Sequence, residues 1–213
     1  MAEKIHINKS ESKQLVMLNP HNLDLELDLE ADARLMLHVV CLDGSDSENR
    51  ICIRFLGEGA EADIYGLALT RSTEKLAIDT LVLHEVGGCK SRQTFKYLLR
   101  DNSSASFHGL LRVAPNAQHT DASQTNRNIL LSPTARMHTE PQLEIYADDV
   151  KCSHGATTGQ LDESALFYMQ QRGLSLQTAR AMLLQAFCSD VIEQISDDRL
   201  RLQISEQIEQ LVK

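Results

Sequence analysis

The part of the chain that decides the fold is residues 141–159, which read PQLEIYADDVKCSHGATTG. Leu143, Ile145 and Ala147 alternate with Glu, Tyr and Asp side chains at the two-residue period of a pleated strand. Two glycines, Gly155 and Gly159, bound the end of the stretch and are typical of a turn. The stretch therefore predicts an extended strand followed by a turn.

Two potential metal ligands continue the same period. Val150, Cys152 and His154 fall on one face, while Lys151 and Ser153 point the other way. Thiolate and imidazole suit iron or zinc, so Cys152 and His154 are candidate ligands. Two ligands do not complete a metal site. The spacing leaves open a second interpretation, in which the cysteine is a small buried hydrophobe and the histidine bonds to backbone in a turn.

Upstream of this stretch, short apolar segments recur roughly every 8 to 15 residues with polar turns between them. The first begins near Gln14, and Leu23 to Glu30 alternates leucine with carboxylate, which is typical of a strand with one solvated face. Residues 115–128 form a polar connection, and no helical period occurs before residue 160. This pattern predicts a mainly β protein that is a sandwich, a barrel or a β-solenoid, without choosing among them.

The period changes after residue 159. Asp162 suits the first turn of a helix that ends at Gly173, Ser175 can cap a second helix, and Ser196 with the two following aspartates begins a third. We expect a β domain of residues 1–159 and a C-terminal helical subdomain of residues 160–213. The apolar stripes of three short helices form either a docking face or a layer packed back on the strands.

Composition limits the classes of function. The 213 residues carry a net charge of −9, which disfavours binding to nucleic acid and to anionic membranes. Five widely spaced cysteines, an odd number without a Cys-x-x-Cys motif, argue against a disulfide framework and favour a reducing compartment. The N-terminal residues lack a signal peptide and no apolar run has the length of a membrane span, so we expect a soluble, cytoplasmic protein.

No catalytic motif survives inspection. Residues 57–60 start like a phosphate-binding loop but lack the third glycine, and His84-Glu85 is followed by Gly88 where a zinc protease needs its second histidine. The sequence also lacks a nucleophile elbow and a Walker loop. We therefore expect neither enzymatic activity nor a nucleotide site in this chain.

Residues 141–159, together with Asp162-Glu163 and the run FYMQQRG at residues 167–173, resemble the C-terminal signature of the SufB/SufD family. Members of this family are scaffold proteins of the SUF machinery for iron–sulfur cluster assembly. The tetrapeptide CSHG at residues 152–155 resembles the SufD branch. The resemblance implies a right-handed parallel β-helix with a helical C-terminal part. Family members are commonly much longer, so we expect a short member or one that lacks upstream coils.

The resemblance also implies a function. A nascent iron–sulfur cluster would be shared between this chain and a SufB-like chain. This chain would supply His154, the stronger candidate ligand, and Cys152. A SufC-like ABC ATPase would dock on helices within residues 162–195. The isolated chain could form a homodimer. The alternative is a β-solenoid or sandwich that serves only as an interaction module or as a structural homodimer, without a metal.

Overall fold

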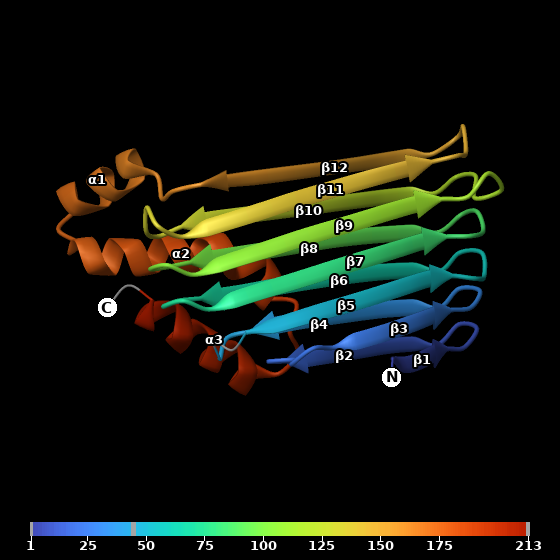
Figure 1. Ribbon diagram of the computed structural model, residues 1–213, viewed down its shortest axis with the longest axis horizontal. Helices are drawn as coiled ribbons and strands as arrows, with labels where there is room; N and C mark the ends of the chain where they lie inside the picture. Colours follow the sequence, from blue (N-terminus) through green and yellow to red (C-terminus); the bar gives the residue numbers. More distant parts are fainter. Residues whose placement is uncertain (1, 44–45, 212–213) are drawn as a thin grey trace.

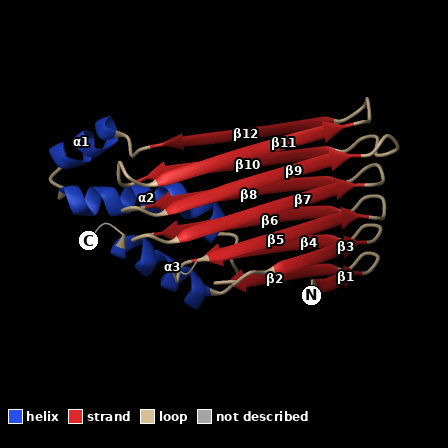
Figure 2. Cartoon of the chain, in the orientation of Figure 1, coloured by secondary structure: helices blue, strands red, loops and turns tan. Residues whose placement is uncertain are grey.

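The computed structural model describes residues 2–43 and 46–211 and shows a parallel β-solenoid with three C-terminal helices (Figures 1 and 2). This confirms the predicted fold class. The elements are β1 Glu3–Ile7, β2 Ser12–Leu18, β3 Asp24–Leu29, β4 Arg34–Cys41, β5 Ser47–Phe55, β6 Glu61–Thr70, β7 Lys75–His84, β8 Lys90–Leu99, β9 Ser104–Val113, β10 Asp121–Leu130, β11 Arg136–Ile145, β12 Lys151–Gly159, α1 Glu163–Gln171, α2 Leu176–Ile192 and α3 Asp198–Gln210.

The strands form two parallel sheets, and each coil of the solenoid contributes one strand to each sheet. The odd-numbered strands make sheet A, in the order β1-β3-β5-β7-β9-β11, and the even-numbered strands make sheet B, which runs from β2 to β12. In sheet B, Glu61 pairs with Lys90, Lys90 with Asp121, and Asp121 with Lys151. One coil therefore takes about 30 residues, and side chains one coil apart in sequence are neighbours in space.

Alternate side chains of both sheets point inward and stack in columns. The largest side chains that are fully buried are Tyr97, Phe55, Phe95, Phe107, Ile7, Leu25, Leu27, Leu29, Leu37, Ile51, Ile53 and Ile64. The rings of Phe95 and Phe107 lie 4.7 Å apart between the sheets. Gly66 is the register partner of Phe95, and a Cβ at this position would overlap Cδ1 of the ring. A glycine in the neighbouring strand thus makes room for the ring of Phe95.

Helices α2 and α3 cover the outer face of sheet B near the C-terminal ends of its strands (Figure 1). Their buried side chains share one cluster with outward-facing residues of the strands, which comprises Val40, Leu42, Leu67, Leu69, Leu98, Ile129, Leu184, Cys188, Val191, Ile192, Ile195, Leu200, Ile204, Ile208 and Leu211. Most of the predicted apolar stripe therefore packs back on the solenoid. In α1, only Leu166 is buried. The division into two domains at residue 159 stays a prediction.

The three helices begin close to the predicted positions. Asp162 accepts hydrogen bonds from the first backbone N–H groups of α1, and Ser175 does so for α2. The third helix is capped by Asp197, one residue beyond the expected Ser196. Gly173, with φ of 89°, adopts the left-handed conformation that ends α1. None of the described helices has both the length and the apolar character needed to cross a bilayer.

Three sequence predictions about strands were wrong. A strand already forms at Glu3–Ile7, upstream of Gln14. Most of the polar segment of residues 115–128 belongs to β10, and the segment from Gly155 to Gly159 extends β12 instead of forming a turn. In each case the neighbouring rung supplies the backbone hydrogen bonds, so the ladder imposes an extended conformation that the local residues do not favour by themselves.

Candidate functional site

The upper end of the stack in Figure 1 is open, because no described strand covers β11 or β12. Within the described residues, β12 pairs only with β10, and β11 only with β9. The backbone N–H of Lys151 donates to Thr120 O at 2.8 Å, on the side of β10. Since alternate residues of a strand bond to opposite sides, the N–H groups of the even-numbered residues 152–158 point away from the sheet. This edge can pair with another strand.

Cys152 and His154 lie together on this edge strand. Their register partners in β10 are Ala122 and Gln124, both of which are buried. The two candidate ligands therefore face the inner side of the open last coil, and they share one face as the alternation predicted. The expected continuity with Leu143 was wrong, because β11 ends at Ile145 and β12 belongs to the other sheet.

The two side chains differ in their surroundings. Cys152 is half-buried and packs against the small cluster of Leu111, Val113, Ala117, Ala122 and Ala147. His154 is exposed, and its ring forms no hydrogen bond or ion pair with any described residue. An exposed imidazole without a partner is free to bind a ligand from solvent or from another chain.

The Cys152 thiol is held in its protonated form. Burial raises the pKa of Cys152. A backbone hydrogen bond from Ala122 opposes this effect, and the charge of Asp121 adds a smaller increase. Lys151 points to the opposite face and does not contribute. The ligating form is the thiolate, so a metal ion or a positively charged partner group must displace this proton.

This pair is incomplete as a metal site. No third His, Cys, Asp or Glu among the described residues forms a three-ligand group with Cys152 and His154. A four-ligand iron–sulfur site needs further donors from outside this part of the chain. The open edge supplies room for them. The ligand role of the two residues stays a prediction.

Below His154, a column of buried amides runs into the solenoid. The sequence pattern did not predict this column. Gln93 of β8 is the register partner of Gln124, and Gln124 is that of His154. Neither amide atom of Gln124 has a hydrogen-bond partner, and Nε2 of Gln93 has none, although its Oε1 accepts from the Thr80 hydroxyl at 3.0 Å. Unpartnered buried amides are costly, and Gln124 lies at the register position directly beneath His154.

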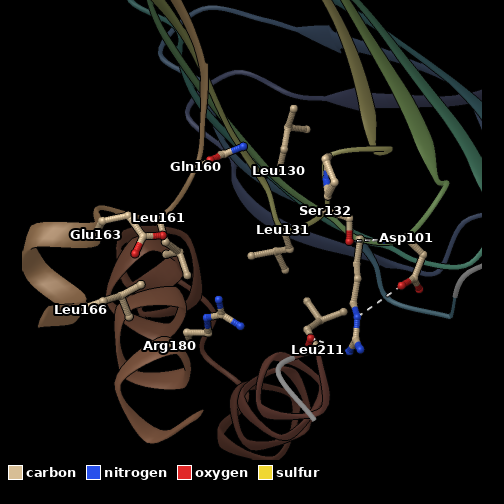
Figure 3. Close-up of a pocket in the computed structure, with 12 residues that line it drawn as sticks. Asp101, Leu130, Leu131, Ser132, Gln160, Leu161, Glu163, Leu166, Arg180 and Leu211 are labelled. Carbon is tan, nitrogen blue, oxygen red and sulfur yellow. Dashed lines mark hydrogen bonds and ion pairs between the residues drawn. The ribbon is translucent and has the colours of Figure 1, made fainter. Parts of the chain in front are cut away.

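A second feature lies where the helices meet the ends of the strands. A cavity of about 400 Å³ is bordered by the loops after β8 and β10 and by all three helices (Figure 3). Arg180 of α2 points into it, between Leu161, Leu131 and Leu211. Arg100 closes one side, because its Nη1 donates to the carbonyl of Leu211 at 2.7 Å. This contact ties the end of α3 to the solenoid.

Helix α1 projects from this junction with large apolar side chains exposed. Phe167 and Tyr168 are 64% and 59% exposed, and Leu176 and Met182 of α2 are also exposed. The guanidinium of Arg172 covers the ring of Tyr168 at 5.0 Å. Exposed aromatic side chains on a helix that buries only one residue are characteristic of a docking surface.

Residues 9–187 match the family model described as SUF system FeS cluster assembly, SufBD core domain. The chain belongs to the SufBD family. It is 38% identical over 193 residues, which is 91% of this chain and 46% of the relative, to the iron-sulfur cluster assembly protein SufD of Escherichia coli strain K12. It is 34% identical over 184 residues, 86% of this chain and 39% of the relative, to the chloroplastic protein ABCI7 of Arabidopsis thaliana.

A SufBD family protein of Mycobacterium leprae is 31% identical over 189 residues, 85% of this chain and 48% of that relative. The chain thus spans less than half the length of these curated relatives. The family match includes β12, α1 and most of α2, so the open edge and the projecting helix both lie in the SufBD core region.

Proposed function

We propose that this chain is a scaffold subunit on which iron–sulfur clusters are built within a cytoplasmic SUF assembly complex. The observation that carries the proposal is a thiol and an imidazole on one face of β12, an edge strand that pairs with β10 alone among the described strands, in a member of the SufBD family. The nascent cluster is the cargo of the scaffold. Cys152 and His154 supply ligands from this chain, and a SufB-like chain supplies the others.

The SufB-like partner pairs with the strand edges of the open coil. Residues 152–158 of β12 carry outward-pointing N–H groups that a partner strand would satisfy, and β11 offers a second edge at the same end of the stack. Strand addition at β12 places partner side chains next to His154 and Cys152, which is where the missing ligands are needed. A second copy of this chain could occupy the same edge, which gives the homodimer.

The ATPase partner, a SufC-like subunit, docks on helices within residues 162–195. Support comes from the exposed Phe167 and Tyr168 on α1, beside a helix that is fixed to sheet B. Since α2 packs on the solenoid and α1 does not, movement of a docked ATPase would pull on α1 and be transmitted through residues 172–175. Nucleotide binding and hydrolysis belong to that partner, and this chain acts as a scaffold without its own catalytic residues.

The test is co-expression with SufB-like and SufC-like chains, followed by anaerobic cluster reconstitution. We expect His154→Ala to abolish most cluster absorption while the purified complex keeps its subunit composition, and Cys152→Ser to reduce it. Ser153→Ala, on the opposite face of the same strand, is the matched control and should leave assembly unchanged. Reconstitution that is equal in the His154→Ala and Ser153→Ala complexes would favour the rival function, an interaction module without a metal.

Edge pairing is tested separately with proline. At Ala156 the N–H points away from β10, so Ala156→Pro removes a donor needed only by a partner strand. We expect this variant to fold normally and to lose association with the SufB-like chain. Thr157→Pro is the control for folding, because it removes a donor to β10 and should destabilise the last coil. Unchanged association of the Ala156→Pro variant contradicts pairing at this edge.

A further inference from the structure

The outer face of sheet A carries a second group of metal-ligand side chains, on the sheet opposite the one that holds Cys152 and His154. His108 lies on β9, and His138 and Glu140 lie on β11. Their donor atoms all lie within 4.8 Å of one another, and no other set of three His, Cys, Asp or Glu in the described part of the chain meets this condition. The three residues belong to sheet A and point outward, whereas Cys152 and His154 belong to sheet B and point inward.

The parallel register brings the three together. His108 is the register partner of Glu140, and His138 lies two residues before Glu140 on the same face. Oε2 of Glu140 is 3.7 Å from Nε2 of His108 and 3.6 Å from Nε2 of His138. With metal–nitrogen bonds of about 2.0–2.1 Å, donors in a tetrahedral site are about 3.3 Å apart. Small rotations of exposed side chains would close these donors around one ion.

An independent contact orients His108. Asp79 of β7 is its register partner on the other side, and Oδ1 of Asp79 accepts a hydrogen bond from Nδ1 of His108 at 3.0 Å. This bond places the proton on Nδ1 and leaves the lone pair of Nε2 facing Glu140. A carboxylate that holds the far nitrogen of an imidazole is the usual outer-shell partner of a histidine that binds a metal.

The site is open to solvent. The side chains of His108, Glu140 and His138 are 45%, 49% and 69% exposed. Glu140 and His108 also border a groove of about 480 Å³ on the same face. Water can therefore complete the coordination shell, and an ion can enter and leave. A partner strand added to the edge of β11 would lie beside this face without covering it.

We propose that His108, His138 and Glu140 form an exchangeable site for a borderline divalent metal ion of the Fe²⁺, Co²⁺ and Zn²⁺ class, with Asp79 as a positioning residue. Two imidazoles and one carboxylate with open positions suit these ions. Mg²⁺ and Ca²⁺ prefer shells of oxygen ligands and should bind poorly. This inference does not depend on the scaffold function, because it uses neither Cys152 nor His154.

Titration of the metal-free full-length chain with Co²⁺ tests the proposal, because visible absorption bands report the ligand set. We expect one equivalent of Co²⁺ to give bands without thiolate charge transfer, and Zn²⁺ to displace it. His138→Ala and Glu140→Gln should each weaken binding at least about tenfold. Asp79→Ala should weaken it by a similar factor, and Asp79→Asn should restore part of the affinity because the amide oxygen still accepts from Nδ1.

His119→Ala is the matched control, since His119 forms a surface ion pair with Asp149 at 2.9 Å but lies in no three-ligand group. It should leave Co²⁺ binding unchanged, as should the double variant Cys152→Ser/His154→Ala. Circular dichroism confirms that each variant is folded. Absence of saturable Co²⁺ binding, or binding that persists in the double variant His108→Ala/His138→Ala, overturns the proposal and leaves these residues as surface ion pairs only.

Discussion

The ammonium group of Lys96 on β8 lies 2.5 Å from Oδ1 of Asp190 on α2. The same group donates to the carbonyl oxygen of Phe187 and covers the ring of that residue at 4.8 Å. Lys96 is only 4% exposed, whereas the Asp190 side chain is 56% exposed. A single lysine on the outer face of sheet B therefore contacts the C-terminal part of α2 through an ion pair, a backbone hydrogen bond and a cation–π contact.

Replacing Lys96 by methionine should weaken this attachment. The variant keeps the hydrocarbon stem but removes the ammonium group's hydrogen bonds to Asp190 and to the Phe187 carbonyl, so we expect a loss of about 2–3 kcal/mol in the free energy of unfolding. Amide hydrogen exchange should also speed up in α2. Lys90→Met is the matched control on the same strand, because Lys90 pairs with Glu61 at 2.9 Å at the surface and should contribute less than about 1 kcal/mol. Equal losses of stability in the two variants would contradict a special role of Lys96 in attaching α2.

Gly66 should be irreplaceable for steric reasons. An added methyl group would overlap the ring of Phe95, which is fully buried and held against Phe107. We expect Gly66→Ala to cost about 2–3 kcal/mol, because the ring cannot move without displacing its neighbours. Gly155→Ala on β12, where nothing lies within 4 Å of the added carbon, should be neutral or slightly stabilising. Urea unfolding of the two variants makes the comparison, and a neutral Gly66→Ala would show that the core can adjust.

The sequence is most informative where the core is aliphatic. Leucines at every second position of residues 23–29 predict β3 correctly, because their inward face is apolar and their outward face is charged. The same rule fails for β10, whose inward side chains include Gln124, Asn126 and Asn128. Local pattern cannot reveal this strand, since it is imposed by pairing with β8.

Among the candidate site residues, too, some could be predicted from the local pattern and others could not. Cys152 and His154 are two residues apart, so strand alternation alone predicts that they share a face. The group of His108 and Glu140 is formed by residues one coil apart, and only the register of β9 and β11 joins them. The coil length of about 30 residues is the signal that could have found it, because aligning the sequence at that repeat places His108 beside Glu140 and Gln124 beside His154.

Acid should destabilise the fold through two buried histidines. Burial lowers the pKa of His38 to about 4 and that of His84 to about 4. In the unfolded chain both take up a proton near pH 6.5. Between about pH 6.5 and pH 4 the unfolded state binds more protons, so the free energy of unfolding falls as the pH is lowered through this window. Above about pH 6.5 this penalty is absent.

His38→Leu should reduce that acid sensitivity. Neither ring nitrogen of His38 has a hydrogen-bond partner among the described residues, and the ring stacks on Tyr65 with 5.1 Å between centroids. Leucine removes the buried polar atoms, so we expect higher stability at pH 7.5 and a larger gain, about 2 kcal/mol more, at pH 5. Urea unfolding at both pH values measures this. An equal gain in stability at both pH values would show that His38 does not titrate in this range.

We expect the buried amide of Gln124 to lower the stability of the fold while it supports cluster assembly. Both of its amide atoms are buried without partners directly beneath His154, and its Nε2 lies close to the backbone of Gly109 in the opposite sheet. Gln124→Leu fills the same space without the polar atoms, so we expect the free energy of unfolding to rise by about 1 kcal/mol. If the amide orients the imidazole for cluster binding, the more stable variant should nevertheless assemble clusters more slowly in the complex with its partners, whereas Gln124→Glu should lose stability at neutral pH because it buries a charge. A Gln124→Leu complex that is both more stable and fully active would show that the buried amide has no part in holding His154.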